Sequence, residues 1–264
     1  MNAPYRDFVR EFERLLDGAA ALPRGVPRVD APRAATSGAP TVLVLAPHPD
    51  DECLVGVLPR RLQREQGWRV AVAAVTWGSR QDRQAARRTE LAGACGYLGW
   101  DMLDADAGLA RVVREAAPQL ILFPHADDAN STHREVQRRA LAALGEVGAD
   151  YSGFVAETEY WSTLRDPNLM VAASADDAAD LAAALSFHEG EIARNPYHVL
   201  LPCWLADGAR RGAELVGGQG SGAASGRFAA LYRLSRWDGR ALARVTGPGR
   251  IAAEGSDIAA LLAP

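Results

Sequence analysis

The 264-residue chain contains no lysine, because all 29 of its basic residues are arginines. This absence excludes enzymes that form a Schiff base through lysine, and nucleotide-binding loops that use a lysine to contact phosphate. Only three cysteines occur, widely spaced and odd in number, which argues against a disulfide framework. A net charge of −4 argues against a general nucleic-acid-binding surface.

Long apolar runs are also missing. No run approaches the roughly 20 residues that a transmembrane helix requires, and the N-terminal residues are too polar for a signal peptide. We therefore expect a cytoplasmic protein without a transmembrane segment. The length suits one α/β domain, or a main domain with a small annex.

The first 40 residues differ in character from the rest of the chain. Residues 5–16 place apolar side chains at helical spacing, which predicts a helix that packs on the body or on a partner subunit. Residues 22–40 are rich in Pro, Ala and Gly and are typical of a linker. We predict an N-terminal helix and linker over 1–40 and a catalytic domain over 41–264. Assembly into a homo-oligomer through this helix remains an open alternative.

From residue 41 onward, apolar strand patterns alternate with helical patterns. Residues 41–47, 69–77 and 119–125 predict buried strands, and the segments after them predict helices. This alternation predicts an α/β fold: a Rossmann-like, mostly parallel sheet with helices on both faces. Residues 230–247 predict a hairpin in a small C-terminal β annex. Sheets of this kind place their functional sites at the carboxyl ends of the strands.

A cluster of His48, Asp50, Asp51 and Glu52 follows directly on the first predicted strand. If a helix begins near Asp51, the side chains of His48 and Asp51 can point into one small volume. These two residues then supply two ligands for a divalent metal, and a catalytic site normally has three protein ligands. The adjacent Asp50 would point elsewhere and take a different role.

The segment after residue 124 repeats this design, with an apolar strand followed by polar side chains and a helix. The polar residues are His125, Asp127, Asp128, Asn130 and His133. The third ligand is expected to come from this segment. Two imidazoles and one carboxylate suit zinc best, and iron(II), manganese and cobalt stay open.

Three motifs together resemble the LmbE/PIG-L zinc-dependent N-deacetylases. These are "APHPDDE" at 46–52, "HADDANSTHR" at 125–134, and "RRTELAGACGYLG" between them. The resemblance covers roughly residues 41–235. It implies a hydrolase that removes an N-acyl group, usually acetyl, from an amino sugar or a glycoconjugate.

The resemblance also implies roles for individual residues. Metal ligands would be His48, Asp51 and His133, and Asp50 would be the general base. The chemistry agrees, because a bound metal lowers the pKa of water to about 7 and polarises an amide oxygen. A carboxylate beside the metal can take a proton during attack and return it to the leaving amine.

One position departs from the family pattern. Three residues before the last ligand the family usually has a second histidine, thought to stabilise the oxyanion, whereas this chain has Asn130. An amide can donate a hydrogen bond to an oxyanion, and one such donor can be worth about 100-fold or more in rate. It cannot carry a positive charge or protonate the amine. Either Asp50 would then handle all proton transfer, or the difference means slower turnover or a different substrate class.

Further residues are candidates for supporting roles. Glu52 would brace the loop or support His133 from behind. His125 would lie beside the site or bond to the backbone, and Asp128 would orient a ligand or face solvent. His198 has a structural interpretation, as a buried imidazole.

Substrate contacts are expected from three residues. Arg87 lies where the family has an arginine on the substrate side, and it suits sugar hydroxyls or an anionic group. Trp77 would wall the pocket or belong to the core. His188 lies on a predicted helix where the family often carries a histidine.

Three rival functions remain beside N-deacetylation. One is a zinc-dependent amidase that cuts a larger amide, such as a thiol conjugate. Another is a metal-binding homologue with little catalysis. The last is a nucleotide-binding Rossmann module, but no Gly-x-Gly-x-x-Gly motif follows the first strand, and carboxylates there would repel a pyrophosphate.

Overall fold

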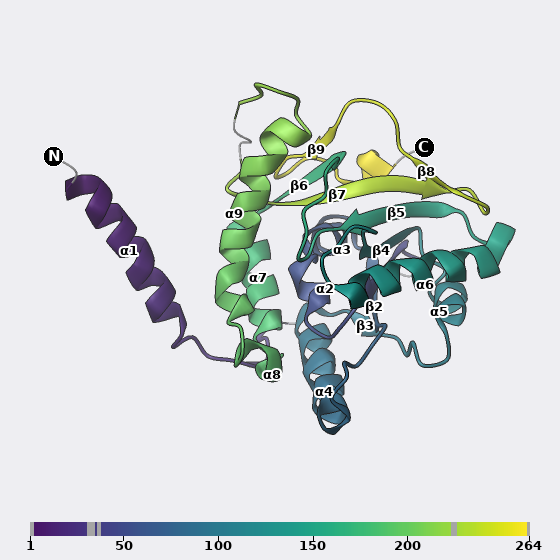
Figure 1. The fold of residues 1–264 in the computed structure, drawn as a ribbon, viewed down its shortest axis with the longest axis horizontal. Helices are drawn as coiled ribbons and strands as arrows, with labels where there is room; N and C mark the ends of the chain where they lie inside the picture. The colour runs from purple at the N-terminus through teal and green to yellow at the C-terminus, as the bar shows by residue number, and fades with distance from the viewer. Residues whose placement is uncertain (1–2, 31–34, 36–37, 223–225, 263–264) are drawn as a thin grey trace.

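A computed structural model describes residues 3–30, 35, 38–222 and 226–262 of the chain. A single sheet runs through this part of the molecule (Figure 1). Its nine strands are β1 Thr41–Ala46, β2 Arg69–Ala74, β3 Asp101–Met102, β4 Leu120–Pro124, β5 Gly153–Thr158, β6 Leu169–Ala173, β7 Phe228–Trp237, β8 Leu242–Arg244 and β9 Arg250–Ala252. The order across the sheet is β3-β2-β1-β4-β5-β7-β6-β9. The short strand β8 pairs with residues 235–237 of β7, beyond the part of β7 that pairs with β6.

The first five strands form a parallel half-sheet. β1 lies at its centre, between β2 and β4, and all pairings among these five strands are parallel. β7 then runs antiparallel between β5 and β6, so the C-terminal strands extend the same sheet. The predicted hairpin is confirmed by the antiparallel pairing of β7 with β8.

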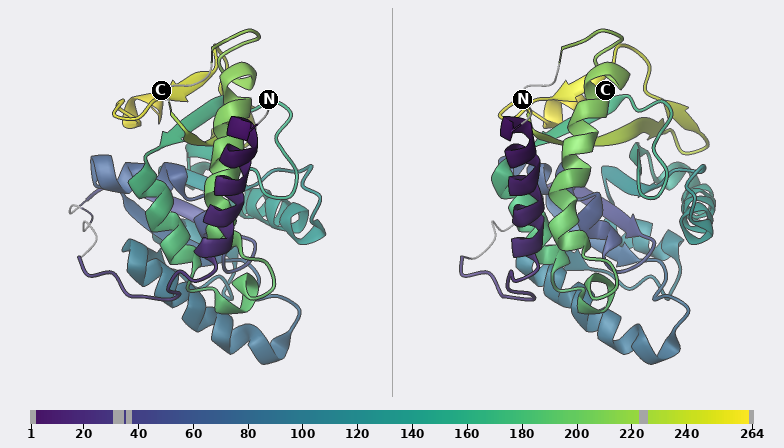
Figure 2. Two further views of the ribbon diagram at one scale, coloured as in Figure 1. Left: turned by 90° about the vertical axis from the view of Figure 1, so that its left-hand side faces the viewer. Right: turned by 60° about the vertical axis from the view of Figure 1, so that its left-hand side comes forward.

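Helices cover both faces of the sheet (Figure 2). Their bounds are α1 Ala3–Ala19, α2 Asp51–Leu54, α3 Val57–Gln66, α4 Gln81–Leu98, α5 Leu109–Ala116, α6 Ser131–Val147, α7 Ala175–Leu185, α8 Glu189–Ile192 and α9 Tyr197–Leu215. The side chains of β1 alternate between two cores, with Val42 and Val44 facing α3, α4 and α7, and Leu43 and Leu45 facing α5 and α6. The predicted fold class is confirmed.

The segment after β1 was expected to form one helix but is divided into α2 and α3. Gly56 lies at the break, where an added Cβ would come within 2.5 Å of Leu181 on α7. Pro59 lies in the first turn of α3, where its missing N–H removes no helical hydrogen bond. Because of this break, α2 and α3 are separate helices, and the loop that follows β1 leads into α2 alone.

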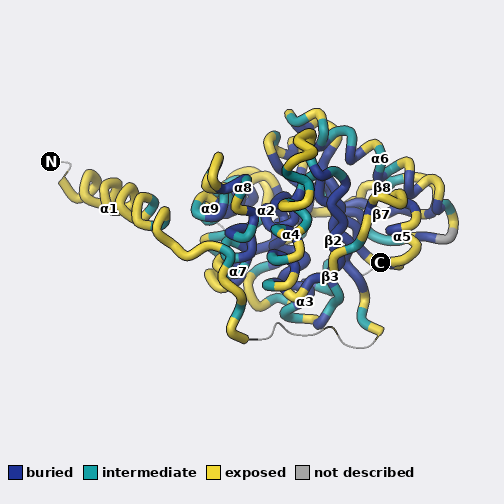
Figure 3. Tube along the Cα trace, turned by 90° about the horizontal axis from the view of Figure 1, so that it is seen from below, coloured by how far each residue is buried: buried dark blue, intermediate teal, exposed yellow. Residues whose placement is uncertain are grey.

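The N-terminal helix α1 extends away from the sheet (Figures 1 and 3). None of its described residues is buried, and its apolar stripe is open to solvent, with Tyr5 78% and Phe8 71% exposed. The structure therefore does not show this apolar stripe packed on the body of the protein. Packing on a partner subunit stays a prediction.

Within the described part of the chain, every helix is too short or too polar to cross a bilayer.

Candidate active site

The site lies where β1 and β4 end. These two strands pair in parallel, with Val42 opposite Leu120 and Val44 opposite Leu122. Their carboxyl ends therefore meet at one edge of the sheet, and the loops that follow them lie side by side. The first loop leads into α2 and the second into α6, so both polar clusters of the sequence are brought together.

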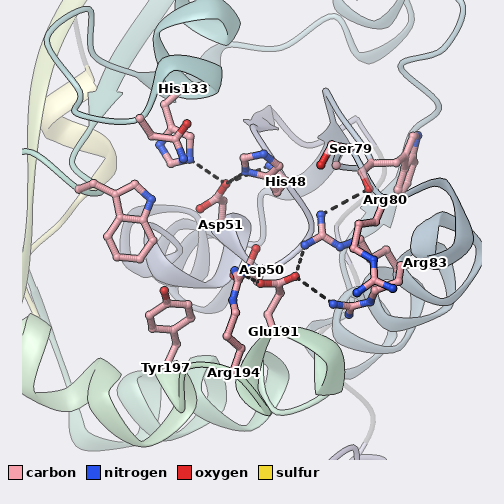
Figure 4. A pocket seen from close by; sticks show the side chains of 15 residues that line it. His48, Asp50, Asp51, Ser79, Arg80, Arg83, His133, Glu191, Arg194 and Tyr197 are labelled. Carbon is pink, nitrogen blue, oxygen red and sulfur yellow. Dashed lines mark hydrogen bonds and ion pairs between the residues drawn. The ribbon is translucent and has the colours of Figure 1, made fainter.

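His48, Asp51 and His133 converge at this edge (Figure 4). Asp51 Oδ2 lies 3.3 Å from His48 Nδ1 and 3.5 Å from His133 Nε2. The backbone N–H of His48 donates to the same oxygen at 2.9 Å, which fixes the carboxylate in the loop. The two imidazole rings are 5.6 Å apart between centroids.

This geometry fits a small divalent cation. A tetrahedral ion about 2.1 Å from each ligand places neighbouring ligand atoms about 3.4 Å apart, close to the 3.3 and 3.5 Å observed. The Nε2 of the buried His133 lacks a hydrogen-bond partner among the described residues. Buried polar atoms are normally satisfied, so an electron-pair acceptor at Nε2 would account for this unpaired nitrogen.

Asp128 lies behind His133. Its Oδ1 is 3.4 Å from His133 Nδ1 and accepts the N–H of Asn130 at 2.8 Å. Its Oδ2 accepts the N–H of Trp161 at 3.1 Å. Burial opposes ionisation of Asp128, but the neighbouring imidazole and backbone donors outweigh it and lower the pKa of this carboxyl. Asp128 is thus held as an anion that can orient the ring of His133.

His125 takes the backbone alternative of its two expected positions. Its Nε2 lies 3.0 Å from the carbonyl oxygen of Ser162, and its Nδ1 accepts the N–H of Asp127 at 3.2 Å. The ring is buried and does not line the pocket. His125 therefore ties the loop after β4 to the segment after β5.

Glu52 and His188 form a fully buried pair, with Glu52 Oε1 2.7 Å from His188 Nε2. The carboxylate also accepts the backbone N–H of Asp50 at 2.9 Å and the thiol of Cys53 at 3.1 Å. Glu52 thus braces the loop and does not contact His133. The expected substrate contact of His188 is corrected, because a fully buried ring that is bonded to Glu52 cannot reach the pocket.

Asp50 has an unusual backbone, with φ 112° and ψ −33°. A non-glycine residue with positive φ is strained, by about 1–3 kcal/mol, and such strain is concentrated at functional sites. The hydrogen bond from its N–H to Glu52 and the one from Cys53 N–H to its carbonyl hold this conformation. The side chain consequently turns into the pocket while Asp51 turns toward the two histidines.

The Asp50 carboxyl is nearly buried among other acids. Burial raises its pKa well above the ordinary value, and the charges of Asp51, Glu52 and Glu191 raise it further, while Arg87 opposes them. No described group donates a hydrogen bond to its side chain, which leaves the carboxyl available to a molecule in the pocket.

Asn130 is the N-cap of α6. Its Oδ1 accepts the backbone N–H of Thr132 at 2.9 Å, so the Asn130 side chain caps this helix. This bond identifies the oxygen of the amide and assigns the other position to the NH₂ group. The residue lines the pocket, and among the described residues no acceptor binds this NH₂.

The pocket has a volume of about 300 Å³ and contains the three histidine and aspartate ligand side chains together with Asp50 and Asn130. Arg87 lines it and is paired with Glu191, and its expected contact with substrate stays a prediction. Trp77 is both wall and core: it is 8% exposed and its Nε1 donates to Asp106 at 3.2 Å.

Beyond β5, four lining residues were not identified from the sequence: Trp161, Glu191, Arg194 and Tyr197. Trp161 follows β5, Glu191 lies on α8, Arg194 lies between α8 and α9, and Tyr197 begins α9, all far along the chain from the metal-ligand motifs. The one available indication was the "HEGEIAR" segment at 188–194, where two glutamates and an arginine follow His188.

The buried Glu52–His188 pair gives a direct test of how the loop is held. His188→Leu leaves the Glu52 carboxylate buried without its imidazole partner. We expect the free energy of unfolding in urea to fall by about 3–5 kcal/mol. Zinc affinity should fall about 10-fold or more because the adjacent ligands lose their support.

His198→Leu is the matched control. His198 is also buried, but neither of its ring nitrogens has a partner among the described residues, and burial lowers its pKa. Its replacement should therefore change stability by less than about 1 kcal/mol. Equal losses of unfolding free energy in both variants would show that the Glu52–His188 contact adds nothing to stability beyond the burial of an imidazole.

Comparison with known proteins identifies the fold but no close relative. No protein-family profile matches the chain, and no curated protein sequence matches it. Among solved structures, the N,N'-diacetylchitobiose deacetylase of Pyrococcus horikoshii is 16% identical with a TM-score of 0.53, over 86% of this chain and 92% of that one. A deacetylase of the A40926 pseudoaglycone is 15% identical with a TM-score of 0.57, over 76% and 98%.

The same fold also occurs in a protein of different activity. The 4-carboxy-2-hydroxymuconate hydratase of Pseudomonas putida is 18% identical with a TM-score of 0.57, over 79% of this chain and 98% of that one. At such identities the likeness concerns the fold and leaves the reaction to the site itself. The chain has the fold of the LmbE/PIG-L-type deacetylases.

Proposed function

We propose that the protein is a metal-dependent hydrolase that removes an N-acyl group, acetyl in the first instance, from an amino sugar or a related metabolite. The observation that carries this proposal is the convergence of His48, Asp51 and His133 in a pocket that also contains the unpaired carboxyl of Asp50. The deacetylases among the structures of similar fold support a hydrolytic reaction.

His48, Asp51 and His133 would hold the metal, with zinc as the expected ion because it accepts two imidazoles and a carboxylate. When bound, such an ion activates water near neutral pH and polarises a carbonyl oxygen. Asp128 keeps the His133 ring in position, so that Nε2 and not Nδ1 faces the site.

Asp50 is the proposed general base and acid. Its side chain lies in the pocket beside Asp51, and among the described residues it has no competing hydrogen-bond donor. It can take a proton from the attacking water and deliver it to the nitrogen of the leaving amine, a role that contributes typically about 10²–10⁴-fold in rate. Its strained backbone keeps it apart from the ligand carboxylate of Asp51.

Asn130 is the proposed oxyanion donor. Because its oxygen is held by the N–H of Thr132, its NH₂ group is the part that remains for the pocket. An amide N–H can stabilise the negative charge that develops on the carbonyl oxygen. Proton delivery then rests on Asp50 alone.

The pocket volume of about 300 Å³ lies at the small end of the range for ligand sites, roughly 300–1,000 Å³. It thus favours a small metabolite over a bulky amide, although an amidase acting on a thiol conjugate and a weakly catalytic metal-binding homologue remain rivals. A cytoplasmic location and a homo-oligomer formed through α1 stay predictions.

The test is release of free amine from a panel of N-acetyl amino sugars, using metal-stripped protein with and without added zinc. We expect zinc-dependent release from at least one member. In the zinc-loaded protein, Asp50→Asn should lower kcat about 10²–10⁴-fold because the proton acceptor is lost. His133→Ala should lose both the zinc and the activity.

Zinc content measured on the same samples shows whether a variant lost activity because it lost the metal. Asp50→Asn should retain one zinc per chain, since Asp50 is not a ligand. Full activity in Asp50→Asn would disprove its role as the base. Zinc bound without release from any sugar would favour a larger amide substrate or a silent homologue.

Asn130→Asp separates the oxyanion role from helix capping. Aspartate caps a helix as well as asparagine does, so the midpoint of thermal unfolding should not change. The variant has no N–H to donate, and we expect kcat to fall about 100-fold or more. An unchanged kcat would assign Asn130 to capping alone.

A further inference from the structure

One wall of the pocket carries more positive charge than its neighbours neutralise. Arg80, Arg83, Arg87 and Arg194 all line the cavity. Arg80 is the N-cap of α4 and Arg83 lies in its first turn, where the helix dipole disfavours cations, and Arg87 follows one turn later. Their position is therefore not explained by the stability of the helix.

The carboxylates near this wall are fewer than the guanidinium groups. Glu191 is shared by Arg83 at 3.6 Å, Arg87, and Arg194 at 2.5 Å, and Arg80 pairs with Asp82 at 2.7 Å. Burial opposes ionisation of Glu191, yet its bond with Arg87 and the other arginines lower its pKa, so it is an anion.

Four guanidinium groups therefore face two paired carboxylates, those of Glu191 and Asp82. The whole chain has a net charge of −4, so this concentration of positive charge is a local property. Asp50 lines the same pocket and lies within the electrostatic reach of Arg87, but among the described residues no ion pair joins it to these guanidinium groups.

Two glycines make room for these arginines. A Cβ on Gly190 would lie 1.4 Å from Arg83 Nη2, and a Cβ on Gly78 would lie 2.5 Å from Arg87 Nη1. Gly78 also has φ +80°, whereas at Gly190 the only close atoms are those of the flexible Arg83 side chain, which an added Cβ would displace. The guanidinium groups of Arg83 and Arg87 are thus seated against the backbone, with side chains 26% and 12% exposed, whereas Arg80 and Arg194 extend toward solvent.

Arg83 retains unused donors. Its Nη1 donates to the carbonyl of Gly190 at 3.2 Å, whereas its Nε and Nη2 have no hydrogen-bond partner among the described residues. Its side chain is 26% exposed, which is enough for contact with a bound molecule. A guanidinium with two free donors in a fixed fork matches the geometry of a carboxylate or phosphate.

The far side of the pocket offers a different surface. Figure 4 shows Tyr197 and His133 away from Arg80 and Arg83, with His48 and Asp51 between. The ring of Tyr197 lies 5.4 Å from that of Trp161, which is 43% exposed. Aromatic faces of this kind pack against the apolar face of a sugar ring.

We propose that Arg83, with Arg80 and Arg194, forms an anion subsite, and that the substrate is an N-acyl amino sugar bearing a carboxylate or a phosphate ester. This inference rests on the proposed function and narrows it to acidic substrates. The anionic group binds the arginine wall while the amide reaches the side of His48 and Asp51.

The first test compares the rates at which neutral and acidic sugars are hydrolysed. We compare kcat/KM of the zinc-loaded enzyme for N-acetylglucosamine, its 1- and 6-phosphates, and N-acetylmuramic acid, which carries a carboxylate. An acidic substrate should be preferred at least about 10-fold over the neutral sugar, the worth of one charge-assisted hydrogen bond. Preference for the phosphates or for the muramic acid identifies which anion is recognised.

Variants assign the preference to the arginine wall. Arg83→Gln should lower the acidic-to-neutral ratio of kcat/KM about 10-fold. Gly190→Ala should lower it in the same direction by displacing the Arg83 guanidinium, a flexible group that can move without unfolding the protein. Arg138→Gln, an exposed ion-paired arginine on α6, is the control and should keep the ratio.

Binding distinguishes failure of this inference from failure of the proposed function. Titration calorimetry on the metal-free protein compares glucosamine with its 1- and 6-phosphates. At least 10-fold tighter binding of a phosphate that is lost in Arg83→Gln supports the subsite even if no sugar is hydrolysed. Equal affinity for glucosamine and its phosphates, or equal kcat/KM for neutral and acidic substrates in an active enzyme, overturns it.

Discussion

The parallel pairing of β1 with β4 is the constraint on which the site depends. It places the ends of two strands, about 80 residues apart in the chain, at one edge of the sheet. His48 and Asp51 then meet His133 across that edge, and Asp51 Oδ2 lies within 3.5 Å of both imidazoles. Every other feature of the pocket is arranged around this meeting point.

Concentrating so many carboxylates in one loop requires compensation. Asp50, Asp51 and Glu52 are all buried, and ionised groups in such positions are costly unless paired. Glu52 is paired with His188, Asp51 with the two histidines, and Asp50 is left with a raised pKa and a strained backbone. Asp50, the carboxyl without a partner, is thus the one placed for proton transfer.

Sequence patterns predicted β1, β2, β4 and the hairpin of β7 and β8, together with the two polar segments that follow β1 and β4, because those features are local. Continuous apolar runs mark buried strands, and polar residues at their ends mark the site. Glu191, Arg194 and Tyr197 could not be placed, since their position depends on how α8 and α9 pack beside the pocket. The insertion of β7 between β5 and β6 is equally non-local. The positive φ of Asp50 reflects hydrogen bonds that only the folded loop provides.

Anomalous diffraction at the zinc absorption edge, from crystals grown with zinc, tests the central claim most directly. The structure predicts one peak, about 2.0–2.2 Å from ligand atoms of His48, Asp51 and His133. Glu52, Cys53 and His188 also lie close enough to hold an ion, but the contacts among them already satisfy Glu52. A peak at that second group, or no peak at saturating zinc, would contradict the assignment.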